Sequence, residues 1–228
     1  MSALSMLCLI AVIVWVALVM AAHVLTPEQS ALSVGMSGLA CGPYGWVMKV
    51  AFVVRGVAAL LLVAAIPFAV SSAATSAVGL ALLWVWGLGS ALLAVYATDM
   101  PGEPPTGTGR IHALIALVAY VAVGVGMILV SLRLGDDEAT AGLARWALPV
   151  ALLAAVAMVV QFVGFGAAAR DAGAETPDTS GVSDAPDASG AAGARSPSFG
   201  GLGRYAGLLQ RVFVGIVMLW TALVAAGI

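Results

Sequence analysis

The sequence predicts an all-α fold, a polytopic membrane protein built as a bundle of six transmembrane helices. Hydrophobic residues make up 62% of the chain and charged residues 9%, with a mean hydropathy of +1.10. Soluble domains carry roughly 25% charged residues. Six apolar runs reach the length of about 20 residues that crosses a hydrocarbon core of roughly 30 Å. The net charge of −2 and the lack of a basic patch exclude a nucleic-acid partner.

The predicted helices belong to a single domain of residues 1–228 and cover about 5–24, 46–68, 77–97, 110–132, 143–168 and 205–226. We expect the first helix to be retained, with a cleaved signal peptide as the alternative, because no basic residue precedes Lys49. Residues 169–203 are rich in Ala, Gly, Ser, Asp and Pro, which predicts a disordered loop. Cys8 and Cys41 are predicted to be free thiols, since one lies in a membrane helix and the other in a loop.

Six crossings put both termini and loops two and four on one side, and loops one, three and five on the other, which we call face B. Face B receives seven of the nine basic residues: Lys49, Arg55, Arg110, Arg170, Arg195, Arg204 and Arg211. The other side receives Arg133 and Arg145. Basic residues concentrate on the cytoplasmic side of membrane proteins. The pattern therefore predicts a multi-pass protein of the cell membrane with both termini outside and loops one, three and five in the cytoplasm.

Polar residues also gather at the face-B ends of the helices, and every helix contributes at least one. They are His23, Lys49, Arg55, Tyr96, Asp99, His112, Gln161, Gln210 and Arg211. Arg55 lies roughly 13 Å along the second helix, at a depth where a charge costs at least ~2.5–3.5 kcal/mol. We therefore expect Arg55 to face the bundle interior with a partner. Interfacial anchoring of the ring and a structural Arg55–Asp99 ion pair are the simplest interpretations.

A second interpretation is a polar ligand-binding cavity at face B, with neither catalytic residues nor a cofactor. Its candidate residues are His23, Tyr44, Arg55, Asp99, His112 and Arg211. Three alternatives stay open. A zinc ion could use His23, Asp99 and His112, because histidine and carboxylate are zinc ligands. A haem could lie between the two histidines, or Arg55, Arg110 and Arg211 could hold an anionic lipid head group.

Three stretches resemble a family of bacterial six-helix membrane proteins catalogued as a domain of unknown function. They are HVLTP at 23–27 with GPYGW at 42–46, TDMPG at 98–102 with GRIH at 109–112, and GLLQR at 207–211. The resemblance implies the fold and supports the choice of polar residues, and it implies no activity. The chain departs from the family pattern at Leu39, where tyrosine is frequent, and at Gln210, where glutamate is frequent. A fainter likeness to membrane hydrolases of the ceramidase and adiponectin-receptor type concerns layout alone.

These observations favour a non-enzymatic binding or membrane-organising protein that accommodates a lipid head group or a small solute. A metal-dependent membrane hydrolase and a small transporter subunit are the alternatives. The transporter lacks the visible internal repeat that many transporters carry. The expected partners are membrane lipid and a second copy of the chain in a homo-oligomer.

Overall fold

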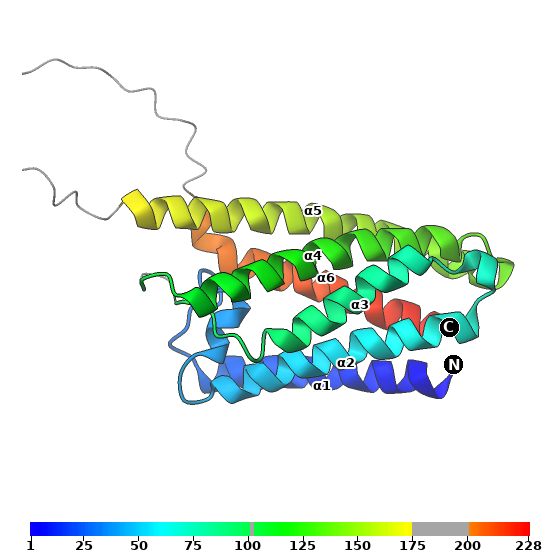
Figure 1. The fold of residues 1–228 in the computed structure, drawn as a ribbon, viewed down its shortest axis with the longest axis horizontal. Helices are drawn as coiled ribbons and strands as arrows, with labels where there is room; N and C mark the ends of the chain where they lie inside the picture. Colours follow the sequence, from blue (N-terminus) through cyan, green and yellow to red (C-terminus); the bar gives the residue numbers. More distant parts are fainter. Residues whose placement is uncertain (101–102, 175–200) are drawn as a thin grey trace, which may run out of the picture.

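Long antiparallel helices lie along one common direction and form an elongated bundle (Figure 1). The computed structural model describes residues 1–100, 103–174 and 201–228. The α-helices of these residues are α1 (Ala3–Leu25), α2 (Gly45–Ala69), α3 (Ala77–Leu92), α4 (Gly107–Leu134), α5 (Glu138–Ala174) and α6 (Ala206–Gly227). Short 3-10 helices cover Met36–Ala40, Ser72–Ala74 and Gly203–Tyr205.

Three of these helices begin at a capping side chain that the sequence supplies. The hydroxyls of Ser2, Ser76 and Thr106 each accept a hydrogen bond from a backbone N–H three residues later, at the starts of α1, α3 and α4. Each such cap stabilises a helix by about 1 kcal/mol. Hydroxyl residues therefore set these three boundaries.

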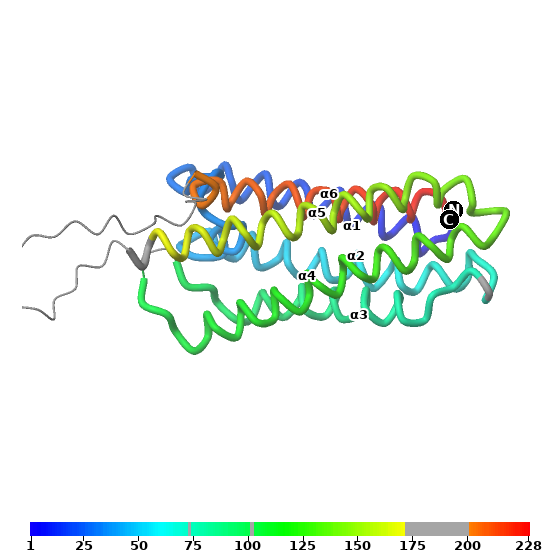
Figure 2. Tube along the Cα trace, turned by 90° about the horizontal axis from the view of Figure 1, so that it is seen from above, coloured from blue at the N-terminus to red at the C-terminus, as the bar shows by residue number. Residues whose placement is uncertain are grey.

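Consecutive helices pack against each other, and α6 also contacts α1 and α2 (Figure 2). Both termini lie at one end of the bundle, next to the α2–α3 and α4–α5 connections (Figure 1). The α1–α2 and α3–α4 connections lie at the opposite end, together with the last turn of α5 and the first of α6. That opposite end is face B.

The predicted fold class is confirmed, because the described residues form an all-helical bundle with an apolar outer surface. Helices α1, α2, α4 and α5, and the stretch Gly203–Gly227, are long and apolar enough to cross a membrane. Large apolar side chains such as Phe68, Ile13 and Trp146 point outward. An outward apolar surface with polar groups inside is what a lipid environment requires.

The third helix is shorter than predicted, since α3 ends at Leu92 and not at Ala97. Its sixteen residues fall below the length of the other spans. The carbonyl of Tyr96 bonds the His112 ring and so serves a tertiary contact. A helix that continued through position 101 would also lose a backbone hydrogen bond there, because proline has no N–H to donate. The chain therefore leaves the helix early, and residues 93–100 cross face B as an irregular segment.

The fifth helix is longer than predicted at both ends. Asp137 accepts a hydrogen bond from the Ala139 N–H at 2.9 Å and starts α5 five residues before the expected position. The helix continues to Ala174. The prediction of a disordered loop is therefore wrong for residues 169–174. The remainder of that loop, apart from residues 201–203, lies outside the described residues. Both cysteines are free thiols, as predicted.

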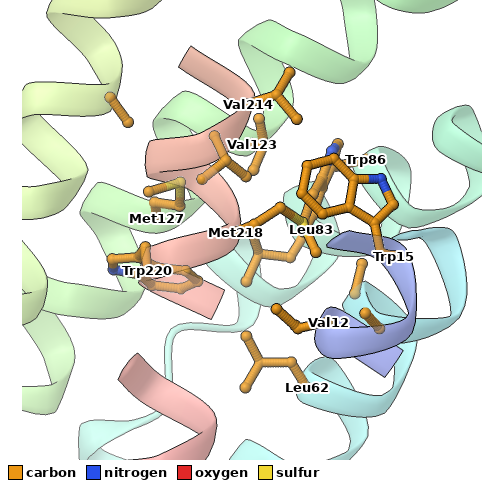
Figure 3. Close-up of a cluster of buried hydrophobic side chains, with 14 of the residues drawn as sticks. Val12, Trp15, Leu62, Leu83, Trp86, Val123, Met127, Val214, Met218 and Trp220 are labelled. Carbon is orange, nitrogen blue, oxygen red and sulfur yellow. The ribbon is translucent and has the colours of Figure 1, made fainter. Parts of the chain in front are cut away.

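The bundle core joins large side chains from five helices (Figure 3). They include Val12, Trp15, Leu62, Leu83, Trp86, Val123, Met127, Val214, Met218 and Trp220. Nearer face B, α2 and α3 approach so closely that a Cβ added to Gly56 would lie 2.6 Å from the Gly87 carbonyl oxygen. Small residues permit such close approach in membrane bundles. This contact brings Arg55 of α2 within reach of Ser90 of α3.

Candidate binding pockets at face B

Two hollows lie in the face-B half of the bundle, and they share no lining residue. The larger, which we call the loop-side pocket, has a volume of about 550 Å³. It is lined by Ser33, Val34, Gly35, Ser37, Gly38, Thr98, Asp99, Met100, His112, Ala113, Ala116, Leu117, Tyr120, Gln161, Phe162, Phe165, Ala168, Gly203, Ala206 and Gln210. The smaller, the α1–α6 groove, has a volume of about 230 Å³. Its lining is Trp15, Val16, Val19, Met20, His23, Met36, Arg211 and Gly215.

Gln210 fixes the polar floor of the loop-side pocket. Its Oε1 accepts from the Met36 N–H at 2.6 Å, and its Nε2 donates to the Tyr120 hydroxyl at 3.0 Å. The backbone N–H can only donate, so the orientation of the amide is determined. Tyr120 Oη is therefore an acceptor toward α6, and its own hydrogen is left to donate elsewhere. Because Tyr120 lines the pocket, that donor is available to a ligand.

Arg55 lies in the bundle interior behind this floor, with 1% of its surface exposed. Its Nε donates to Ser90 Oγ at 3.1 Å, and its Cζ lies 5.3 Å from the centre of the Phe52 ring. Its Nη2 has no hydrogen-bond partner. Within the described residues, no carboxylate forms an ion pair with this buried cation.

The expected Arg55–Asp99 ion pair is wrong. Among the described residues the one ion pair joins Arg133 and Asp136, at the far end of the bundle. The Asp99 carboxylate instead accepts from the Thr106 hydroxyl at 2.6 Å and from the Thr106 N–H at 3.0 Å. These two bonds, in that order, hold the pKa of the Asp99 carboxyl below its ordinary value, and the Arg110 charge adds to the effect. Asp99 therefore stabilises the start of α4.

The same contact explains a glycine in the sequence motif that precedes His112. A Cβ on Gly109 would collide with the Asp99 carboxylate. Gly109 also donates its N–H to the Thr106 hydroxyl, which caps α4. Asp99, Thr106 and Gly109 therefore form one local unit that orients the first turn of α4 and the His112 side chain at the pocket.

Gln161 of α5 lines the opposite wall and is 1% exposed. Its Oε1 is buried and has no hydrogen-bond partner. Leaving a buried carbonyl unpaired costs about 1–3 kcal/mol. The pocket thus carries an unused acceptor on α5 and an available donor, Tyr120, on α4.

His112 and Ser37 form a hydrogen-bonded pair at the same pocket. The Nδ1 of His112 donates to the Tyr96 carbonyl at 2.7 Å, because that oxygen can only accept. The neutral ring then accepts at Nε2 from the Ser37 hydroxyl at 3.0 Å. The pair ties α4 to the first loop, and it also has the contact geometry of a nucleophile and its base.

His23 belongs to the α1–α6 groove and not to the loop-side pocket. Its Nδ1 donates to the Val19 carbonyl at 2.7 Å, and its Nε2 accepts from Arg211 Nε at 2.9 Å. Arg211 Nη1 donates to the carbonyls of Val34 and Gly207 at 2.8 and 2.9 Å. Arg211 therefore joins α1, the first loop and α6.

The structure does not bring the predicted zinc ligands together. His112 and Asp99 line one hollow and His23 the other, and both histidines already use both ring nitrogens. No group of three or more His, Cys, Asp or Glu within the described ranges is arranged to hold a metal ion. The same hydrogen bonds oppose a haem held between the two histidines, because they occupy the ring nitrogens that would bind the iron.

Of the other predicted site residues, Tyr44 precedes α2, is 47% exposed, and lines neither hollow. The predicted single cavity is thus divided between Asp99 and His112 on one side and His23 and Arg211 on the other, with Arg55 behind the first. The sequence patterns did not single out Ser37, Trp15 or Tyr120 as site residues. Tyr120 stands eight residues after His112, a spacing that occurs along one face of an α-helix, and this could have indicated Tyr120 as a site residue.

Comparison with known proteins gives a family and no activity. A family model described as a protein of unknown function, DUF998, matches residues 9–227. No curated protein and no solved structure matches the chain.

Proposed function

The chain belongs to the DUF998 family of proteins of unknown function, and from its own geometry we propose that it is a non-enzymatic binding protein of the membrane. Its loop-side pocket takes an amphiphile with an uncharged, hydroxyl-bearing head group. The observation that carries this proposal is the pairing of a free donor, Tyr120, with the unpartnered buried acceptor of Gln161 in one pocket. The volume of about 550 Å³ lies in the range typical of small-molecule sites.

A hydroxyl group complements this floor because it donates one hydrogen bond and accepts others. It can donate to Gln161 Oε1 and accept from the Tyr120 hydroxyl. A carboxylate or phosphate fits less well, because it offers no hydrogen to Gln161. The Asp99 carboxylate, which also lines the pocket, disfavours a negatively charged ligand.

An apolar tail complements the walls, which include Phe162, Phe165 and Ala116. Leu117 and Ala113 line the pocket and are also exposed on the outer face of α4. The pocket therefore borders the surface that faces lipid, and a bilayer amphiphile can enter it sideways between α4 and α5. Membrane lipid is thus the proposed source of the ligand.

Thermal unfolding of the purified full chain in detergent tests this function with two probes. We expect 1-monooleoylglycerol to raise the melting temperature in a saturable manner, because its glycerol hydroxyls meet Tyr120 and Gln161. Methyl oleate has the same chain and no hydroxyl, so we expect no saturable shift. Equal shifts with both probes would show that the tail alone is recognised, and the proposed head-group specificity would be lost.

A second candidate function, hydrolysis of an ester-linked amphiphile, is favoured by the Ser37–His112 contact of 3.0 Å in the same pocket. Ser37 Oγ would attack the ester carbonyl while His112 takes its proton and returns it to the leaving alcohol; water would then release the acid from Ser37. A fluorophosphonate probe distinguishes the two functions. Labelling of the wild type that is absent in Ser37→Ala supports the hydrolase, and equal absence of label in both excludes it.

We also propose that the protein resides in the cell membrane with both termini outside and face B in the cytoplasm. The distribution of basic residues supports this orientation, since seven of nine are assigned to face B. Association into a homo-oligomer stays a prediction.

A further inference from the structure

We propose that the α1–α6 groove is a second binding site, and that its ligand is an acidic glycerophospholipid. This site goes beyond the proposed function, because it shares no lining residue with the loop-side pocket and recognises a different head group. The inference rests on unused hydrogen-bond donors, on an unpaired positive charge and on the apolar surface around them.

Two buried donors of the groove have no partner. Trp15 is 6% exposed, and its indole Nε1 makes no hydrogen bond, whereas the buried Trp220 donates its Nε1 to Ser131 at 2.9 Å. Arg211 Nη2 is the second unused donor, although its Nε and Nη1 are both engaged. Buried donors are normally satisfied, so two orphans in one hollow indicate a ligand that brings acceptors.

The positive charge of Arg211 in the groove favours an anionic ligand. Among the described residues, no carboxylate forms an ion pair with Arg211, and none of the residues that line the groove is acidic. His23 does not neutralise the guanidinium, because it accepts the Nε hydrogen bond as a neutral ring. A phosphodiester would supply both the charge and the acceptor oxygens, and arginine binds phosphate well.

The depth of the two donors fits a lipid better than a free anion. Trp15 lies eight residues before His23 on α1, but the His23 ring bonds the Val19 carbonyl, one turn back toward Trp15. The Arg211 guanidinium bonds that ring, so it lies less than the roughly 12 Å of the Cα spacing from the level of Trp15. Arg211 is near the face-B end and Trp15 is near the middle of α1. A glycerophospholipid carries a phosphate and, deeper in the bilayer, acyl ester carbonyls. The phosphate would meet Arg211 and an ester carbonyl would accept from Trp15.

The rest of the groove suits an acyl chain. Val16 and Met20 line it, and their side chains are 46% and 55% exposed on the outer face of α1. Gly215 of α6 forms the facing wall, and a Cβ added there would meet nothing within 4 Å. This glycine leaves a channel that a larger side chain would fill.

Two variants test the site in the full chain in detergent. Trp15→Phe removes the N–H donor and keeps an aromatic ring, and Gly215→Leu fills the channel. Their controls are Trp84→Phe, at a half-exposed tryptophan of α3, and Gly142→Leu, at an exposed glycine of α5 with equally open space around its Cβ. The probes are phosphatidylglycerol, phosphatidylcholine and inorganic phosphate, and the readout is the concentration dependence of the melting temperature.

We expect phosphatidylglycerol to stabilise the wild type and both controls, and Trp15→Phe and Gly215→Leu to weaken its apparent affinity about tenfold. Tenfold corresponds to about 1.4 kcal/mol, the scale of one hydrogen bond to a ligand. Equal stabilisation by phosphatidylcholine would overturn the acidic head group, and equal stabilisation by inorganic phosphate would overturn the lipid. Wild-type affinity in Trp15→Phe overturns the site even if Gly215→Leu fails to fold.

Discussion

We expect the free energy of unfolding of Arg55→Ala in detergent to be about 3 kcal/mol lower than that of the wild type. We expect Arg55→Met to unfold at the wild-type temperature or above it. Alanine leaves a cavity behind Tyr120, and large-to-alanine changes in a core cost roughly 2–5 kcal/mol. Methionine fills most of the volume and removes a buried cation that has no carboxylate partner. Replacing a buried charge by an apolar side chain of similar size is often neutral or stabilising.

Calorimetry of the two variants and of Asp99→Ala measures this prediction. Arg55 bonds Ser90 and Asp99 bonds Thr106, so the two residues do not share a partner. We therefore expect the shifts in melting temperature of Arg55→Ala and Asp99→Ala to add in the double variant. A double variant no less stable than Arg55→Ala alone would restore the ion pair that the sequence suggested. An Arg55→Met protein as unstable as Arg55→Ala would show that the charge itself holds the fold.

Gln161→Leu has effects of opposite sign on stability and on binding. Without ligand the variant should be more stable than the wild type by about 1 kcal/mol, because it removes a buried acceptor that has no partner. With 1-monooleoylglycerol the melting temperature should no longer rise. Thermal unfolding with and without the probe measures both effects.

Gln210→Leu is the matched control, because Gln210 is also a buried glutamine of the loop-side pocket but uses both ends of its amide. We expect it to lose about 2 kcal/mol, since the Met36 N–H and the Tyr120 hydroxyl lose their partner. A loss of stability in Gln161→Leu as large as that in Gln210→Leu would mean that Gln161 is structural.

The helical fold could be predicted because the length and the apolar composition of each run are enough to identify a membrane-spanning helix. The ends of α3 and α5 could not, because they depend on contacts between distant segments. The Tyr96 carbonyl is taken by His112, sixteen residues later, and Asp137 joins the start of α5 to the Ser71 N–H at 3.1 Å. Such contacts leave no periodic signal in the sequence.

The sequence predicted how deep the candidate site residues lie along their helices. It did not predict the direction in which each side chain points around its helix axis. Counting residues from the helix ends placed His23, His112 and Arg55 in the face-B half, where the structure has them. Apolar residues occur around the whole circumference of the helices in the described ranges, so the sequence showed no polar stripe that would indicate which face is buried. In the structure His23 contacts Arg211 of α6, and His112 contacts Ser37 of the first loop. The two histidines therefore line two separate hollows and not the single predicted cavity.

A density map of the full chain with bound 1-monooleoylglycerol tests the binding function most directly. We expect its head group in the loop-side pocket, with a glycerol oxygen about 2.7–3.0 Å from both Tyr120 Oη and Gln161 Oε1. Its chain should leave past Leu117 between α4 and α5. An empty loop-side pocket, with the amphiphile bound on the outer surface alone, would contradict the proposed function.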